Sequence, residues 1–226
     1  MSSEEQEEKK QEKDSVSGLK IVLYSAIFII ILFVIAFSIR FFLTKDVETI
    51  EDLYRKTLAG EESENNYLYN GFAFVKVGPF WYTRIVKGGQ PYDIPFKYDP
   101  KSLDDISVLV EPKDFNHSFI YLTMDPNLTS KTAIASIEVG RIIGNKYGIM
   151  NISTRAAITR PKEGISDDIP VVTCDDVTNE TGVVLFGIGD ITAVVAKNGC
   201  ILVGGTDEEE IIRAADKLAY HILGIA

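Results

Sequence analysis

The hydrophobic pattern of this chain begins with an uncharged run of nineteen residues, from Ile21 to Ile39. Lys20 and Arg40 bracket the run, and the apolar residues 41–43 extend it. At 1.5 Å per residue a helix of this length spans about 28 Å, close to the roughly 30 Å hydrocarbon core of a bilayer. The pattern therefore predicts a transmembrane helix over residues 21–43.

An apolar run near the amino terminus can also be a cleaved signal peptide or a pilin-type leader. A signal peptide is disfavoured because the run is long and residues 40–42 offer no small-residue cleavage site. A pilin-type leader is disfavoured because Lys20 follows soon after Gly18 and Leu23 stands where pilins usually carry Glu. An uncleaved anchor is favoured, and a pilus or filament subunit remains an alternative.

The segments on either side of the span differ in character. Residues 1–20 are rich in Glu, Lys and Gln without aromatic residues, which predicts a disordered charged tail. Residues 44–66 are expected to form a juxtamembrane helix over 46–59 and then a polar linker. The helical spacing rests on five apolar positions: Val47, Ile50, Leu53, Tyr54 and Leu58.

The remaining residues, 67–226, are predicted to form one globular domain. Alternating apolar positions predict strands over 72–77, 80–86 and 92–98, separated by Gly78-Pro79 and Gly88-Gly89 turns, and hence an antiparallel meander. Further strands are expected over 106–110, 119–123, 149–152, 169–173, 183–186, 191–195 and 200–203, with helices over 131–145 and 207–223. Thr129 or Ser130 and Thr206 are the expected amino-terminal caps. The fold class is therefore α/β (α+β), with the meander and a mixed sheet flanked by two main helices.

The orientation of the span depends on residues far from it, because four basic residues lie on each side. Four sequons occur in the domain, at Asn116, Asn127, Asn151 and Asn179. Chance predicts about one in a chain of this composition. The excess favours a cytoplasmic amino terminus and a glycosylated domain outside.

The two cysteines, Cys174 and Cys200, both lie in the domain. An even pair outside the cytoplasm predicts one disulfide, which would stabilise the fold by roughly 3 kcal/mol on the chain-entropy model. The alternative is a pair of buried free thiols.

Charge excludes one class of partner. The formal net charge is −10, of which the residues after Arg40 carry −9. Because an acidic domain repels phosphate backbones, nucleic-acid binding is not expected.

The candidate chemistry gives no catalytic residue, metal site or cofactor. Gly204-Gly205-Thr206 lies between a strand and a helix, but the acidic first turn would repel a phosphate. Two distant histidines and a cysteine pair do not make a zinc site. The three carboxylate pairs are expected to be solvated loop charges, at Asp104-Asp105, Asp167-Asp168 and Asp175-Asp176. In the aromatic meander, Trp81, Tyr82 and Tyr92 could form a binding surface, although core packing is the favoured interpretation.

Three segments resemble a group of uncharacterised small archaeal single-pass membrane-anchored proteins with an extracytoplasmic α/β domain. They are Phe119-Ile-Tyr-Leu-Thr-Met-Asp-Pro, Pro170-Val-Val-Thr-Cys-Asp-Asp and the closing region from Gly199-Cys-Ile-Leu-Val-Gly-Gly to Leu223-Gly-Ile. The resemblance covers residues 67–226. It implies the anchored architecture and supports pairing of Cys174 with Cys200, but it supplies no catalytic residue.

Together these patterns predict a membrane protein whose domain is a structural or interaction component of a cell envelope or surface assembly. Its expected partners are the bilayer, through residues 21–43, and other envelope proteins. The main alternative is an envelope hydrolase that uses carboxylates on glycan or peptide. A cleft containing a carboxylate with a raised pKa would favour that alternative.

Overall fold

The computed structural model describes residues 23–38, 40 and 48–226. The chain divides into two compact units, and the second comprises Ile50–Ala226. This second unit includes the helix Ile50–Leu58, which was expected to lie beside the membrane. The helix belongs to this unit because it packs on the four-stranded sheet described below.

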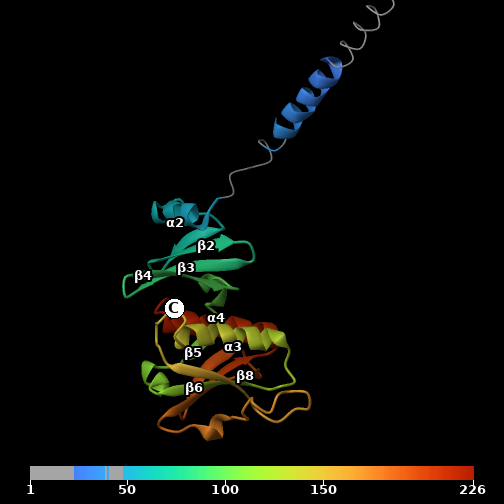
Figure 1. Cartoon of the computed structure of the whole chain (residues 1–226). Helices are drawn as coiled ribbons and strands as arrows, with labels where there is room; N and C mark the ends of the chain where they lie inside the picture. The colour runs from blue at the N-terminus through green and yellow to red at the C-terminus, as the bar shows by residue number, and fades with distance from the viewer. Residues whose placement is uncertain (1–22, 39, 41–47) are drawn as a thin grey trace, which may run out of the picture. The chain divides into compact units, whose positions relative to one another are not determined.

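In the first unit, residues 23–38 form a helix in which every residue is exposed (Figure 1). Its large apolar side chains include Phe33 and Phe37, which are 75% and 74% exposed. Within the described ranges no helix is long and apolar enough to cross a membrane. The rest of the expected span 21–43 and the whole of the tail 1–20 lie outside the described residues, apart from residue 40.

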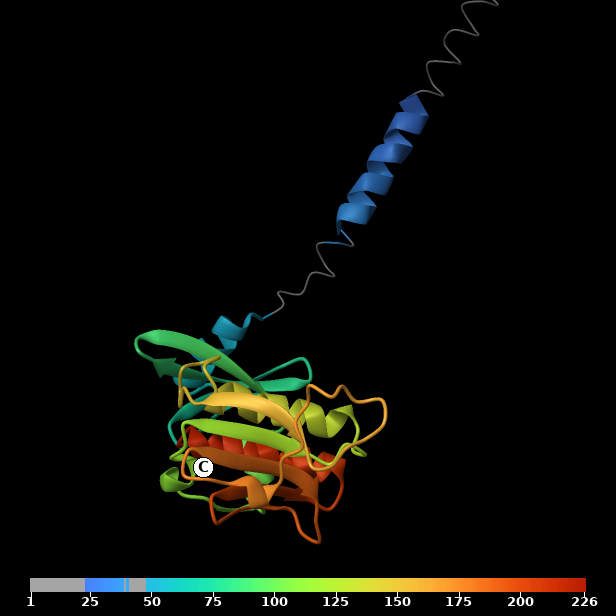
Figure 2. The same cartoon turned by 60° about the horizontal axis from the view of Figure 1, so that its bottom comes forward.

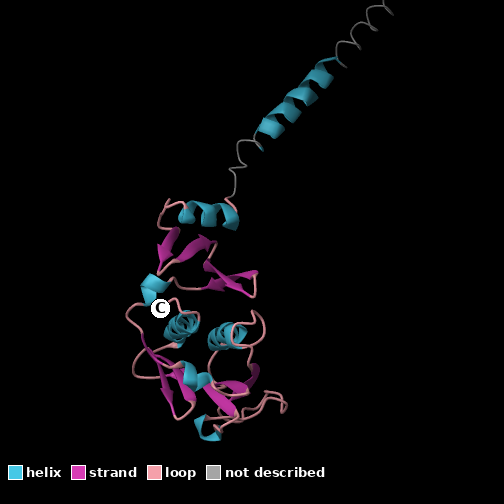
Figure 3. Cartoon of the chain, turned by 90° about the vertical axis from the view of Figure 1, so that its left-hand side faces the viewer, coloured by secondary structure: helices cyan, strands magenta, loops and turns pink. Residues whose placement is uncertain are grey.

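The second unit is built in layers, seen from the side in Figure 3. Helix α2 (Ile50–Leu58) covers one face of a four-stranded sheet, and a pair of helices covers the other face. The same two helices cover one face of a six-stranded sheet. The helix pair is therefore enclosed between two sheets.

The four-stranded sheet, in the order β1-β2-β3-β4, contains the expected three-stranded antiparallel meander and one further strand, β1, which was not predicted. Its strands are β1 (Asn66–Tyr69), β2 (Phe72–Val77), β3 (Phe80–Lys87) and β4 (Gln90–Phe96). Helix α2 contacts this sheet through Leu53 and Tyr54, which cluster with Val75 of β2.

The six-stranded sheet is mixed, with the order β5-β9-β10-β8-β6-β7. Only the β9–β10 pair is antiparallel, and the other neighbours are parallel. The strands are β5 (Ser107–Leu109), β6 (Phe119–Met124), β7 (Ser153–Ile158), β8 (Thr181–Ile188), β9 (Ala193–Lys197) and β10 (Cys200–Gly205). With the helices α3 (Ser130–Ile143) and α4 (Glu208–Ile222), this confirms the expected mixed sheet with two main helices.

The two helices begin where polar side chains can cap them. Thr129 caps α3 by accepting a hydrogen bond from the backbone N–H of Lys131, as one of the two expected caps. Helix α4 is capped by Asp207, which accepts from the N–H groups of Glu209 and Glu210. The expectation of Thr206 as this cap is therefore wrong by one residue, and a carboxylate suits the positive end of the helix dipole.

The helix layer is joined to the meander by the aromatic core. Tyr220 of α4 is fully buried, with its ring centroid 4.2 Å from that of Phe96 and 5.6 Å from that of Phe74. Its hydroxyl donates to the carbonyl of Tyr98 at 2.7 Å, so the polar end of the buried ring is satisfied.

Two expected strands are absent from the described residues. Residues 149–152 form a loop that ends at β7, because Gly148 and Asn151 adopt left-handed backbone conformations with φ of +61° and +58°. Residues 169–173 make only one bridge, between Val171 and Ile158. Pro170 contributes no N–H to a ladder there, so the pairing does not extend.

Candidate functional site

The largest hollow described on the second unit is a groove between α2 and the adjoining face of the meander. Its volume is about 780 Å³. Most of its lining is apolar, and it opens widely to the surface. The lining residues come from α2 and strands β2 and β3: Glu51, Tyr54, Arg55, Leu58, Ala59, Gly71, Phe72, Ala73, Arg84 and Val86. The size lies within the range of about 300–1,000 Å³ usual for ligand sites.

Two aliphatic side chains in this groove are largely in solvent. Leu58, at the end of α2, is 69% exposed, and Val86 of β3 is 64% exposed. Leu58 belongs to the helical stripe recognised in the sequence, but the helix ends before the residue can be covered. The groove therefore presents exposed apolar surface next to the buried contact between α2 and the meander.

Each charged side chain that lines the groove has an ion-pair partner, and that of Arg55 is Asp52. The Arg84 guanidinium bonds both oxygens of Asp93 at 2.7 and 2.9 Å and contacts Glu51 at 2.9 Å. It also lies 4.6 Å from the Tyr54 ring centroid, a cation–π distance. The groove therefore offers no unpaired cation among these residues, and its chemistry favours an apolar occupant over an anion.

The three aromatic residues proposed from sequence as a binding surface do not lie together. Trp81 is only 8% exposed and its ring centroid lies 5.3 Å from that of Tyr67, so it belongs to the core and not to a binding surface. Tyr92 packs on Tyr147 on the helix side of the meander. Tyr82 lies on the opposite face, against the cluster beneath α2. Two of the three thus belong to the core between the meander and the helices.

A row of aliphatic side chains crosses the face of the six-stranded sheet that α3 and α4 leave uncovered. Figure 2 brings this sheet forward, with the helices behind it. Leu109, Val195, Leu202 and Leu185 are register partners on β5, β9, β10 and β8. Leu109 is 67% exposed and Leu202 is 37% exposed. The row is a second candidate contact surface.

All four sequon asparagines are exposed and lie in loops. Asn116, Asn151 and Asn179 come directly before the amino ends of β6, β7 and β8, which are parallel neighbours. In register, Phe119 pairs with both Ser153 and Thr181, which are hydroxyl residues of two sequons. Three sequons therefore share one edge of the sheet, whereas Asn127 lies beyond the opposite end of β6.

The cysteines form the expected disulfide, with a Cα–Cα distance of 5.3 Å. It joins the 3₁₀ turn η3 (Cys174–Asp176) to the start of β10. Cys200 is 2% exposed within a small cluster that includes Val172 and Val183. The bond thereby fixes the long β7–β8 connection to the outer face of the sheet.

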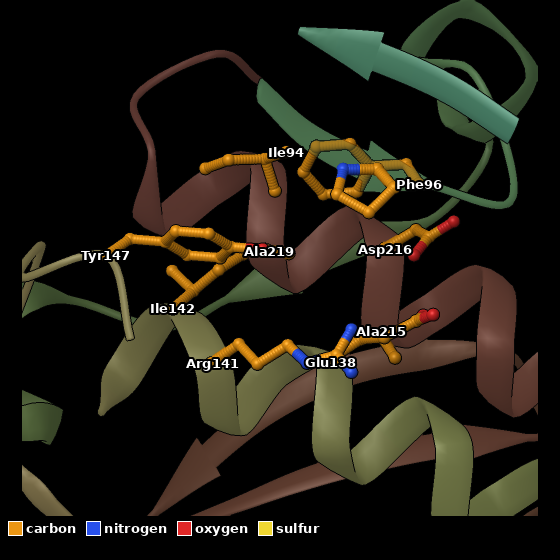
Figure 4. Close-up of a pocket in the computed structure, with 10 residues that line it drawn as sticks. Ile94, Phe96, Glu138, Arg141, Ile142, Tyr147, Ala215, Asp216 and Ala219 are labelled. Atoms are coloured by element: carbon orange, nitrogen blue, oxygen red, sulfur yellow. The ribbon is translucent and has the colours of Figure 1, made fainter. Parts of the chain in front are cut away.

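Two carboxyl groups that the sequence interpretation missed meet between α3 and α4 (Figure 4). Asp216 is 1% exposed, and its Oδ2 accepts from the backbone N–H groups of Lys97 at 2.9 Å and Tyr98 at 2.8 Å. Glu138 has a buried Oε2 without a hydrogen-bond partner among the described residues. In the sequence, Asp216 lies four residues after Ile212 and three before Ala219, both in the apolar stripe of this helix. That spacing could have predicted that the Asp216 carboxyl is buried.

Burial raises the pKa of both carboxyl groups. For Asp216, desolvation and the charge of Glu138 outweigh the two N–H donors and raise its pKa well above the ordinary value. The enclosed space beside the pair is only about 10 Å³, enough for one water molecule. A sugar ring or a peptide does not fit there, so this pair differs from the cleft that a carboxylate hydrolase needs.

The amino terminus of α3 is occupied by a carboxylate of the chain itself. Glu208 accepts from the backbone N–H of Thr129 at 2.9 Å and from the hydroxyls of Thr129 and Thr132 at 2.8 and 2.9 Å. Gly205 lies against the first turn of α4, where an added Cβ would stand 2.3 Å from the Ile211 nitrogen. The Gly-Gly turn therefore serves close packing rather than phosphate binding.

The remaining candidates from sequence take part in local structure. Asp104 accepts from the Tyr69 hydroxyl, Asp105 pairs with Arg213, and Asp176 accepts from the backbone N–H of Thr173. His221 contacts the carbonyl of Val110, and His117 lies against Gly182 and Gly199. In the part of the chain that the structure describes, no three His, Cys, Asp or Glu side chains are grouped to hold a metal ion.

Comparison with known proteins gives no further assignment: no family model, curated protein or solved structure matches this chain.

Proposed function

We propose that this protein is a single-pass membrane protein whose domain stands outside the cytoplasm as a structural or interaction component of the cell envelope. The observation that carries the proposal is the helix over 23–38, which is apolar and exposed on all sides. Such a surface is stable only when apolar material covers it. The uncharged run continues over residues 21–39 of the sequence, the length that a bilayer requires.

The outward orientation is supported by the domain. The Cys174–Cys200 disulfide is a bond that persists in oxidising compartments. The four sequon asparagines are exposed, as a glycan acceptor must be. Both features lie in the second unit, so they indicate the same side for the whole domain.

Translation into glycosylating microsomes tests anchoring and orientation together. We expect the chain to resist alkaline carbonate extraction and to migrate faster after endoglycosidase treatment. Replacing each sequon Asn by Gln, one at a time, should remove one step of the shift for each site in use. A chain that is extracted by carbonate and carries no glycan would overturn the proposal.

The interaction role is supported by the exposed aliphatic row on the six-stranded sheet. Leu109→Glu combined with Leu202→Glu should abolish recovery of specific neighbours when the protein is purified from its native membranes. Ile134 and Ile137 on α3, 52% and 53% exposed, provide the matched control because they lie on a different surface. If Ile134→Glu with Ile137→Glu has the same effect, the row has no special role.

The hydrolase alternative finds less support in the geometry. The buried carboxyl pair has the raised pKa values that acid catalysis uses, but its cavity admits only a single water. A filament subunit remains distinguishable by the mature amino terminus, since processing after Gly18 would remove the preceding residues.

A further inference from the structure

We propose that the groove between α2 and the meander docks on the surface of the membrane that holds the apolar helix, so that lipid chains cover Leu58 and Val86. The inference rests on the proposed membrane anchor and goes beyond it. A tether alone would leave the domain free in water, whereas docking fixes which face of the domain lies against the lipid.

The length of the connecting chain keeps the groove near the membrane. Ile50, the first residue of α2, follows Arg40 by ten residues. Whatever their conformation, ten residue steps span at most about 35 Å. Because α2 forms one wall of the groove, the groove includes the first element of the domain after the apolar helix in sequence.

The surface of the groove suits lipid chains. Leu58 and Val86 are 69% and 64% exposed, and the lining between them is largely apolar. The cations at its base are neutralised, because Arg84 pairs with Asp93 and Glu51. Covering such a surface with lipid removes apolar area from water without leaving a charge unpaired.

Charge is distributed so that this end of the domain can approach a membrane. Residues 50–96 contain five Lys and Arg against six Asp and Glu. Residues 97–226 contain twelve against nineteen. Beside a surface that carries anionic lipid, residues 50–96 would meet little repulsion, whereas the more acidic residues 97–226 would be repelled.

The sequons agree with the same arrangement. All four lie between Asn116 and Asn179, on the loops of the six-stranded sheet, and none lies in residues 50–96. A glycan on the groove would keep it from the lipid. Residues 50–96, which form the groove, therefore carry no glycosylation sequon, whereas the proposed function places glycans on the loops of the six-stranded sheet.

The test places a fluorophore on single cysteines in the full chain, reconstituted in phosphatidylcholine liposomes that contain lipids with a nitroxide quencher on the acyl chain. The variants are Leu58→Cys, Val86→Cys and, as a matched control of equal exposure on the far sheet, Leu109→Cys. The native cysteines are paired in the disulfide and do not compete for the label. Circular dichroism confirms that each labelled variant is folded.

We expect quenching at positions 58 and 86 and none at 109. A glutamate at position 58 should lower quenching of the label at 86 about tenfold, because it removes the burial of one leucine. If the labels stay unquenched while the protein floats with the liposomes, docking is wrong and the anchor stands. If the protein does not float, the anchor itself is wrong.

The remaining outcomes also decide the question. Equal quenching at all three positions would mean that the domain lies on lipid without a preferred face, which overturns the proposal. Energy transfer between labels at position 86 on different chains, without quenching by lipid, would assign the groove to a second copy of the protein.

Discussion

At the scale of single residues, the most informative group is the Asp216 carboxyl. It is buried, accepts hydrogen bonds from two backbone N–H groups of the segment after β4, and lines the same small cavity as Glu138. The other titratable groups beside the two carboxyls are Lys97, Tyr98, Arg141, Tyr147 and Tyr220. The carboxyl thus binds the segment that follows β4 to helix α4, and this places an ionisable group in the core.

The pH dependence of stability follows from this burial. A carboxyl whose pKa is raised in the folded state contributes stability below its ordinary pKa and loses it as the pH rises through the raised value. We therefore expect the free energy of unfolding to fall as the pH rises above the ordinary carboxyl range toward the raised pKa of Asp216. Glu209, whose pKa is lowered to about 2 by Lys97 and Tyr98, remains ionised there and adds no slope.

Asp216→Asn should flatten this pH profile, because the amide oxygen can still accept from Lys97 and Tyr98 but carries no charge. Asp216→Ala should instead cost roughly 2–4 kcal/mol at low pH, where the carboxyl is protonated in both states, since it leaves two buried donors unpaired, and the cost should shrink as the pH rises. Urea unfolding at several pH values measures both effects. An unchanged slope in the Asn variant would show that the charge of Asp216 is not responsible.

Thr83 provides a residue-scale test of the meander core. Its side chain is fully buried, and its hydroxyl has no hydrogen-bond partner among the described residues. Thr83→Val keeps the shape and removes the unsatisfied group, so it should raise the free energy of unfolding by about 1 kcal/mol. A loss of stability on chemical unfolding would indicate that the hydroxyl has a partner after all.

At the scale of elements, the sequence predicted best where a local signal acts alone. Helix α3 starts at its threonine cap, and β6 and β8 follow their apolar runs. The prediction from sequence was wrong where the hydrophobic pattern alone does not determine the structure. Residues 149–152 are as apolar as a strand, but the left-handed backbone of Gly148 and Asn151 makes them a loop. Trp81 alternates correctly, yet only the packed helix layer determines which face of β3 is buried.

The candidate site was less predictable than the fold. The apolar stripe of α2 was visible in the sequence, but the groove depends on where the helix ends and which strands it covers. Glu138 and Asp216 lie on different helices and are more than seventy residues apart in the sequence. The exposed sequons and the cysteine pair required only their own motifs, and these features were found.

Close packing of β10 and α4 can be tested at two neighbouring glycines. Gly205→Ala should cost roughly 3 kcal/mol or more, because its Cβ would lie 2.3 Å from the Ile211 nitrogen. Gly204→Ala is the matched control, since its Cβ would meet nothing nearer than 3.6 Å. Thermal unfolding of both variants makes the comparison, and equal losses would mean that the turn is sensitive for another reason.

The contribution of the disulfide to the stability of the domain is a second test at the scale of elements. The bond closes a separation of 26 residues, for which the chain-entropy model gives roughly 3 kcal/mol. Replacing both cysteines by serine should lower the free energy of unfolding by about that amount without unfolding the domain. A variant of unchanged stability would show that the connection before β8 is held by its packing alone.

At the scale of the whole molecule, three features indicate the same arrangement. An exposed apolar helix precedes the domain, residues 50–96 that come next in sequence are close to neutral, and the sequons and disulfide lie in the more acidic residues 97–226. These features are independent in sequence, which is why a common explanation carries weight. The central claim is that the helix spans the bilayer and leaves the domain outside.

Protease protection on intact right-side-out vesicles tests that claim most directly. With one epitope tag before residue 1 and another after Ala226, added protease should remove the carboxy-terminal tag and leave the amino-terminal tag on a short membrane-bound fragment. The contrary result would be a carboxy-terminal tag that survives until the vesicles are lysed. That result would place the domain inside the cell and contradict the account.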